Sequence, residues 1–305
     1  METLGWIRGS LKLLAEADAK YILLALLLYF VSVLIYAVRW VIVLQRAGVG
    51  LRLRDSMAAY LASILVNNIT PSARAGGELM RILYAYVKTG APLVKLLNTV
   101  AFERICESIP VIALAFVSIS EALLSGNRPL SVLLGSVLIV IATIVGVKYW
   151  DRILTIAAKR LDFDDQLDTE ASVRRLISNK GLFAATIALS ALVWVFDILR
   201  LYAAALAVGW KAPLLRFALA SVMYLVVGIL AITPGGLGIV EGGLTAVFVA
   251  LGAKPSVALA LVMIERLISY GFASLIGLLV VVIGGGPQAW TLLKSRWRRT
   301  GFTPR

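Results

Sequence analysis

The sequence predicts an all-α polytopic membrane protein made of two internal repeats, each with a re-entrant helical hairpin. Three observations carry this prediction: a very apolar composition, several apolar runs about as long as a bilayer is thick, and a polar motif that occurs twice. The 305-residue chain is 60% hydrophobic and 15% charged, with a mean hydropathy of +0.92. A water-soluble protein of this composition would have too little polar side chain to cover its surface.

Five uncharged runs lie near or above the roughly 20 residues that cross the hydrocarbon core. They cover residues 22–38, 129–147, 181–196, 217–240 and 267–293. A sixth apolar stretch, 93–120, carries charges in its first half. The first run has no small-residue cleavage site before it, so we expect a retained helix preceded by a short interfacial amphipathic helix.

A polar motif of arginine, Ile-Thr-Pro, glutamate, proline and Glu-Arg occurs twice in the same order. Pro71 is followed seven residues later by Glu78, and Pro234 is followed seven residues later by Glu241. A motif repeated across two hydrophobic halves is typical of an internally duplicated transporter. The flanking members are Arg39, Gly48, Pro92, Glu103 and Arg104 in the first copy and Arg200, Gly209, Pro255, Glu265 and Arg266 in the second.

The segments around each Ile-Thr-Pro are short. The pieces over 57–70 and 77–88 give only about 20 Å of helix, which is too short to span comfortably. Two such pieces that meet at a proline and glycine break predict a re-entrant hairpin whose turn lines a cavity. The predicted domains are an N-terminal interfacial helix (1–20), a first membrane repeat (21–149), a polar linker (150–180), a second membrane repeat (181–286) and a basic tail (287–305).

Two topologies remain open at this point. If each hairpin returns to its own side, the repeats are inverted, and the basic loops and the C-terminus lie in the cytoplasm with the N-terminus outside. If the short pieces span the membrane, the N-terminus lies inside and the repeats are parallel. The positions of lysine and arginine favour the inverted repeat.

Charged side chains inside the membrane mark the candidate site, because each costs at least about 2.5 to 3.5 kcal/mol without partners or water. Both repeats keep the turn glutamate and the Glu-Arg pair, which we interpret as architecture. Only the first repeat adds two arginines and two asparagines, whose donors suit a phosphate-bearing ligand. The predicted substrate-binding residues are Asn67, Asn68, Arg74, Glu78, Arg81, Glu103, Arg104 and Glu107, with Glu241, Glu265 and Arg266 as second-repeat counterparts.

Other notable side chains have simpler interpretations. Arg39 and Arg200 lie toward helix ends, where we expect snorkelling or a local contact between Asp197 and Arg200. The lone Cys106 is expected to be ordinary helix packing.

Several function classes find no support in the sequence. The chain has no histidine and one cysteine, so we expect no metal site and no internal disulfide. It has no phosphate-binding or dinucleotide-binding glycine motif, so we expect no cofactor. The net charge of +13 comes from basic residues at the ends of apolar segments, which indicates anionic lipid rather than nucleic acid.

The polar motifs together resemble those of the lysylphosphatidylglycerol synthase transmembrane, or flippase-like, family. The resemblance covers about residues 21–286 and rests on Arg39-Trp40, the stretch NNITPSARAGGE ending at Glu78, Glu103-Arg104, and the stretch TPGGLGIVE ending at Glu241. In multidomain relatives this membrane unit accompanies a soluble aminoacyl-transferase or glycosyltransferase domain and is linked to moving modified lipids between leaflets. Only about 20 residues follow Gly286, so we do not expect the synthase activity here.

We therefore expect a lipid flippase or scramblase of the cell membrane rather than an enzyme. A polar, anionic head group would pass through a groove between the repeats, and Glu78 and Glu241 would carry protons if transport is coupled to an ion. Two alternatives stay open: an integral-membrane transferase that uses a carboxylate as base on a lipid-linked substrate, and a non-transporting subunit. The expected partners are membrane lipids, with a second copy of the chain or a partner enzyme as further possibilities.

Overall fold

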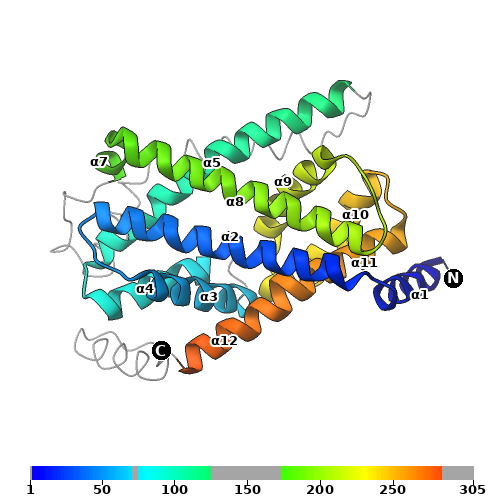
Figure 1. Ribbon diagram of the computed structural model, residues 1–305, viewed down its shortest axis with the longest axis horizontal. Coiled ribbons are helices and arrows are strands. Elements are labelled where there is room, and N and C mark those ends of the chain that lie inside the picture. Colours follow the sequence, from blue (N-terminus) through cyan, green and yellow to red (C-terminus); the bar gives the residue numbers. More distant parts are fainter. Residues whose placement is uncertain (1, 71–74, 125–172, 284–305) are drawn as a thin grey trace.

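The computed structural model describes residues 2–70, 75–124 and 173–283, and every regular element in these ranges is a helix (Figure 1). The predicted all-α class is therefore confirmed for this part of the chain. A helix also forms in the predicted N-terminal segment, as α1 (Glu2–Ala15), and a break before Ala19 separates it from α2 (Ala19–Arg46). The predicted run 129–147, most of the linker and the basic tail lie outside the described residues.

The helices of the two halves follow one another in the same order. The first half contains α2, α3 (Leu53–Ile69), α4 (Ala75–Thr89) and α5 (Leu93–Leu124). After α7 (Val173–Ser178), the second half contains α8 (Lys180–Ala207), α9 (Leu214–Leu230), the 3-10 turn η3 (Pro234–Gly236), α10 (Ile239–Ala250), α11 (Pro255–Arg266), the π-helix η4 (Leu267–Phe272) and α12 (Ala273–Ile283).

Helices α2 and α8, the first long helices of the two halves, begin and end at the same kinds of residue. The side chains of Asp18 and Asn179 accept hydrogen bonds from the first turns of α2 and α8, at 2.9 and 3.1 Å. Gly48 and Gly209 follow their last turns with φ of 72° and 77°, a conformation that glycine adopts without steric cost. The sequence thus stops both helices at the same place in each half.

Within the part of the chain that the structure describes, three helices are long and apolar enough to cross a membrane: α2, α8 and the continuous helix Pro255–Ile283. They contain the predicted runs 22–38 and 181–196 and the first part of 267–293. Large apolar side chains on their outer faces, such as Leu23, Leu27 and Leu278, are about half exposed or more. Such surfaces fit contact with lipid, so the chain is an integral membrane protein.

The uncharged run 217–240 does not form one helix but is interrupted around Pro234, where the sequence predicts a proline and glycine break. Helix α9 ends at Leu230, and α10 begins only at Ile239. The chain between them contains Pro234, which has no backbone N–H, and Gly235, which has a positive φ of 59°. A regular helix cannot continue through this pair.

Helices α3 and α4 are 17 and 15 residues long, somewhat longer than the predicted pieces, and they pack along each other. Gly77 permits the close approach, because a Cβ atom there would lie 2.4 Å from the carbonyl oxygen of Ser63. Its N–H donates to Oδ1 of Asn67 at 2.7 Å. This pairing holds Glu78 and Asn67 at the same end of the hairpin.

Helices α2 and α8 lie side by side and run in opposite directions (Figure 1). Their contacts therefore pair the start of one helix with the end of the other: Asp18 N–H with Ala207 O at 2.9 Å, Ser32 Oγ with Asp197 Oδ1 at 3.4 Å, and Arg39 Nη1 with Ser190 Oγ at 2.8 Å. The first helices of the two halves are thus antiparallel.

Candidate functional site

The charged residues of the first half form a closed ring in which arginine and glutamate alternate. Each member lies within 3.4 Å of two partners of opposite charge, and three helices contribute: α2, α4 and α5. The contacts, in order around the ring, are Arg39–Glu103 (3.0 Å), Glu103–Arg81 (2.8 Å), Arg81–Glu78 (2.8 Å), Glu78–Arg104 (2.8 Å), Arg104–Glu107 (2.8 Å) and Glu107–Arg39 (3.4 Å).

The deep side of this ring is sealed from solvent. Arg39, Arg81 and Glu103 have no exposed surface. Arg81 also lies 4.5 Å from the ring centres of both Trp40 and Tyr60, and it donates a hydrogen bond to the Tyr60 hydroxyl. Two carboxylates, those of Glu78 and Glu103, and two aromatic faces replace the water that the Arg81 guanidinium group loses on burial.

The opposite side of the ring is open. Arg104 keeps 41% of its side-chain surface exposed, and Glu78 keeps 29%. The contact between Glu78 and Arg81 is close, but the arginine N–H groups are not directed at the nearer oxygen, so this contact is an ion pair without a hydrogen bond. Glu78 and Arg104 are therefore the ring members that a ligand can reach.

Among the described residues, the second half makes two of the same ion pairs but no ring. Arg200 pairs with Glu265, as Arg39 does with Glu103, and Arg266 pairs with Glu241 at 2.6 Å, as Arg104 does with Glu78. The ring cannot close here because Leu244 and Ser269 stand at the positions that align with Arg81 and Glu107. Arg200 has a second contact, to Asp197 at 3.5 Å.

The break of the second half rests against the hairpin of the first. Arg266 donates to the Gly235 carbonyl at 2.8 Å and so holds the turn. A Cβ atom at Gly235 would lie 2.6 Å from the carbonyl oxygen of Asn68, the penultimate residue of α3. The Asn68 amide in turn donates to the carbonyl of Ser269 in the π-helix η4 at 3.3 Å. Backbone from both halves therefore meets at one place.

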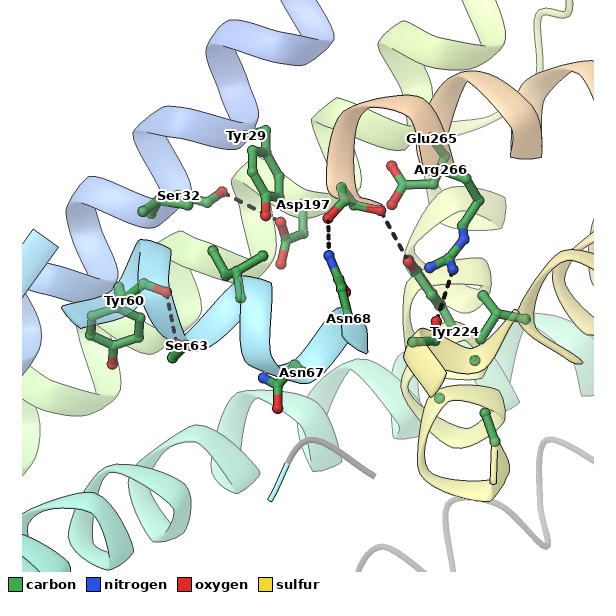
Figure 2. A pocket seen from close by; sticks show the side chains of 18 of the residues that line it. Tyr29, Ser32, Tyr60, Ser63, Asn67, Asn68, Asp197, Tyr224, Glu265 and Arg266 are labelled. Carbon is green, nitrogen blue, oxygen red and sulfur yellow. Dashed lines mark hydrogen bonds between the residues drawn. The ribbon is translucent and has the colours of Figure 1, made fainter. Parts of the chain in front are cut away.

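A cavity of about 240 Å³ opens at this meeting point, and Figure 2 shows many of the side chains that line it. Helices of both halves contribute, among them α2, α3, α8, α9 and α11. Of the predicted site residues, the cavity is lined by Asn67, Asn68, Glu78, Arg104, Glu265 and Arg266. Arg81, Glu107 and Glu241 are not among its lining residues but form ion pairs with residues that are, and Glu103 pairs with Arg81. Arg74 lies outside the described residues.

The prediction that Arg39 snorkels toward a helix end is wrong. Arg39 is fully buried within α2 because Glu103 and Glu107 of α5 lie opposite it. Arg200 is likewise only 5% exposed, although its predicted local contact with Asp197 is present. Cys106 packs in an apolar cluster, as predicted.

Sequence reasoning missed the uncharged polar lining. Tyr29, Ser32 and Tyr36 line the cavity from α2 and lie three and four residues apart, which places them on one helix face with Arg39. This helical spacing of polar residues is the feature of the sequence from which the lining could have been predicted. Tyr224 and Ser269 complete the polar wall from the second half, with 3.5 Å between their hydroxyl oxygens.

Comparison with known proteins identifies the family of this chain. The family described as the lysylphosphatidylglycerol synthase TM region matches residues 4–277. A UPF0104 membrane protein of Pyrococcus horikoshii is 28% identical over 90% of each chain. UPF0104 membrane proteins of Methanothermobacter thermautotrophicus and Methanocaldococcus jannaschii are 27% and 24% identical, over 92% and 90% of this chain and 90% and 87% of theirs. Because this match covers residues 4–277 of the 305, the chain belongs to the lysylphosphatidylglycerol synthase TM family.

Proposed function

We propose that the protein is a flippase or scramblase, which moves the polar head group of a lipid between leaflets through the cavity while the acyl chains stay in the bilayer. The observation that carries the proposal is a cavity lined by six aspartate, glutamate and arginine side chains inside a helical bundle whose outer faces are apolar. An unsatisfied polar group costs several kcal/mol in hydrocarbon, and such a lining offsets that cost. The lining also includes apolar residues such as Val33, Ile64 and Val240, which suit the start of the acyl chains.

The proposed head group carries a phosphate or another anionic group. Arg104 is the arginine best placed to receive it, since it lines the cavity and is 41% exposed. Its guanidinium group contacts Glu78 and Glu107 at 2.8 Å each, so a phosphate would exchange with one carboxylate while the other keeps its contact. Asn67 and Asn68 lie on the same cavity. We propose them as donors to further oxygens of the head group.

The proposed transport mechanism uses an inverted repeat with two re-entrant hairpins. The antiparallel packing of α2 and α8 supports inversion, because these are the first helices of the two halves. The matched ion pairs of Arg39 and Arg200 support a common origin of the halves. In an inverted repeat, exchange of the two halves' conformations opens a central cavity to the two sides in turn. We propose the cell membrane as the location, with the C-terminus in the cytoplasm.

The function is tested by reconstitution into liposomes that contain trace fluorescent lipids. A membrane-impermeant quencher bleaches the outer leaflet, so the fluorescence that remains reports whether lipids cross. Anionic and zwitterionic lipids with the same acyl chains are compared in separate preparations. We expect the wild type to raise the bleached fraction above the half found in empty liposomes, with faster loss for the anionic lipid.

Arg104→Gln is the informative variant, because it removes a charge from the cavity wall while the buried side of the ring keeps its pairs. We expect it to slow movement of the anionic lipid about tenfold or more, the effect of losing roughly 1.4 kcal/mol. Arg54→Gln is the matched control, since Arg54 is 76% exposed and lies outside the cavity. Bleaching by the wild type that equals that of empty liposomes for every lipid tested rejects the proposed function.

A further inference from the structure

Glu265 has an unusual position among the carboxylates of the two networks. Its side chain has no exposed surface, and Oε2 pairs with Arg200. Oε1 accepts no hydrogen bond from any residue that the structure describes. Glu265 nevertheless lines the cavity, and Figure 2 shows it on the wall that it shares with Arg266, across from Tyr29 and Asp197. A buried carboxylate oxygen without a donor is costly, so a missing partner is indicated.

The charges around Glu265 do not balance. Within the described ranges the second-half network has three carboxylates, Asp197, Glu241 and Glu265, and two guanidinium groups, Arg200 and Arg266, which gives 2 − 3 = −1. The first-half ring has three of each and is neutral. Among the described residues, this second-half network therefore has one negative charge more than its guanidinium groups balance, and such a charge inside a membrane is costly without a counter-charge.

The surroundings of Glu265 offer oxygen atoms rather than further cationic groups. Ser269 follows Glu265 by one helical turn, and its hydroxyl lies 3.5 Å from that of Tyr224. The π-helix η4 begins two residues after Glu265, and carbonyl groups of irregular helices are common cation ligands in transporters. The titratable or charged side chains that share the cavity with Glu265 are Tyr29 and Tyr36 of α2, Tyr60 of α3, Glu78 of α4, Arg104 of α5, Asp197 and Arg200 of α8, Tyr224 of α9 and Arg266 of α11.

We propose that this wall of the cavity binds one monovalent cation at Oε1 of Glu265, either a proton or an alkali-metal ion. A hydronium ion would give up one proton and leave as water, and the proton would form an O–H bond at Oε1; the carboxylate becomes a neutral acid, which raises the cluster charge from −1 to 0. An alkali-metal ion would make the same change through oxygen ligands. We assign to Glu265 the ion-coupling role predicted for Glu78 and Glu241, because all three pair with an arginine but only Glu265 is fully buried with one oxygen that accepts no hydrogen bond from the described residues.

Cation binding is measured on the purified protein in detergent, without any transport. A ligand that binds only the folded protein raises the thermal midpoint. Unfolding is followed with a thiol-reactive dye, because the chain has one cysteine, the fully buried Cys106. Sodium and potassium chloride are each titrated against N-methylglucamine chloride at constant ionic strength. Infrared difference spectra between low and high pH report any carboxylic acid that loses its proton.

The two sources of positive charge give different results. If the site takes an alkali-metal ion, the midpoint of the wild type rises with that ion and saturates, and Glu265→Gln loses the response. If it takes a proton, the alkali-metal response is absent, and one carboxylic-acid carbonyl band of the wild type is missing in Glu265→Gln. The proposal is overturned when Glu265→Gln matches the wild type in both measurements.

A second variant tests the proposal independently in case the Glu265→Gln protein does not fold. Asp197→Asn keeps the pair between Arg200 and Glu265 but brings the count of the cluster to zero, so we expect it to lose the alkali-metal response or the infrared band as well. Glu16→Gln is the control with an unchanged response, because Glu16 follows the last residue of α1 and its side chain is exposed. A full response in Asp197→Asn contradicts the charge argument. A role of the cation in transport rests on the proposed function, whereas cation binding does not. If the cation binds but lipids do not move, only the role in transport is rejected.

Discussion

Arg39 of α2 and Glu103 of α5 lie 3.0 Å apart, and neither has any exposed side-chain surface. At the matching places of the second half, Arg200 of α8 pairs with Glu265 of α11. Both pairs tie the first helix of a half to the helix that carries Glu-Arg. They differ in their neighbours, since Glu103 also contacts Arg81 at 2.8 Å whereas no arginine occupies the corresponding place beside Glu265.

Replacing Glu103 should therefore cost more than replacing Glu265. Glu103→Gln leaves two buried guanidinium groups short of a partner, and we expect a loss of about 3 to 5 kcal/mol in the free energy of unfolding. Glu265→Gln leaves Arg200 with Asp197 and removes an uncompensated charge, so we expect less than about half of that loss. Thermal unfolding of both variants in one detergent checks the order, and equal costs would contradict it.

Arg81→Lys should destabilise the protein although it keeps the charge. A lysine ammonium cannot reach two carboxylates in a plane and also stack between Trp40 and Tyr60, as the guanidinium group does. We expect a loss of about 2 kcal/mol. Arg46→Lys at the exposed end of α2 is the control and should change the unfolding midpoint little. A similar midpoint for the two variants would show that charge alone suffices at position 81.

Gly235→Ala should disturb the junction between the halves. Gly235 has a positive φ of 59°, and its missing Cβ leaves room for the Asn68 carbonyl and the Tyr270 ring. We expect about 1 to 2 kcal/mol from the backbone conformation alone, with the clash in addition. Gly242→Ala within α10 meets no atom within 4 Å and should be neutral or stabilising by up to about 1 kcal/mol. The expression level and the thermal midpoint of the two variants are measured. A loss in Gly235→Ala alone indicates local strain, whereas a similar loss in both variants indicates that alanine is poorly tolerated at either glycine.

Cross-linking tests the antiparallel packing of α2 and α8. In a Cys106→Ala background, Ser32→Cys combined with Asp197→Cys should form a disulfide or react with a short bifunctional thiol reagent, because the native side chains are in contact at 3.4 Å. Ser32→Cys combined with Ala185→Cys is the control. Its second cysteine lies about 18 Å further along α8 and should remain unlinked. A linked control with an unlinked test pair would require a different alignment of the two helices.

Much of the helix order follows from the sequence because the signals that set it are local. The caps at Asp18 and Asn179, the glycines after α2 and α8, and the proline and glycine break before α10 all act within a few residues. The run 217–240 shows the limit of hydropathy. It contains no charge, so composition alone treats it as one span, whereas Pro234 and Gly235 divide it.

The candidate site was harder to predict because burial depends on partners that are distant in the chain. Arg39 is 64 residues from Glu103, and nothing in the sequence of α2 indicates that a carboxylate will lie opposite it. The polar residues Tyr29 and Ser32 carry no charge, so a search for intramembrane ions passes over them. Glu78, Arg104 and Glu265 could be predicted because a charged side chain in an apolar segment has a high free-energy cost in the membrane and is therefore rarely present without a role.

The closed ring of the first half has a mechanical consequence. A ring in which every charge has two partners can lose any one contact, and each member still faces an opposite charge. The described residues of the second half form no closed ring: if Arg200 releases Glu265, no second ion pair among them holds that carboxylate, and if Arg266 moves away from Glu241, the turn at Gly235 loses its hydrogen bond to Arg266 as well. We therefore expect the two walls of the cavity to differ in stiffness, with the first half acting as the fixed wall and the second half as the one that yields when the cavity opens.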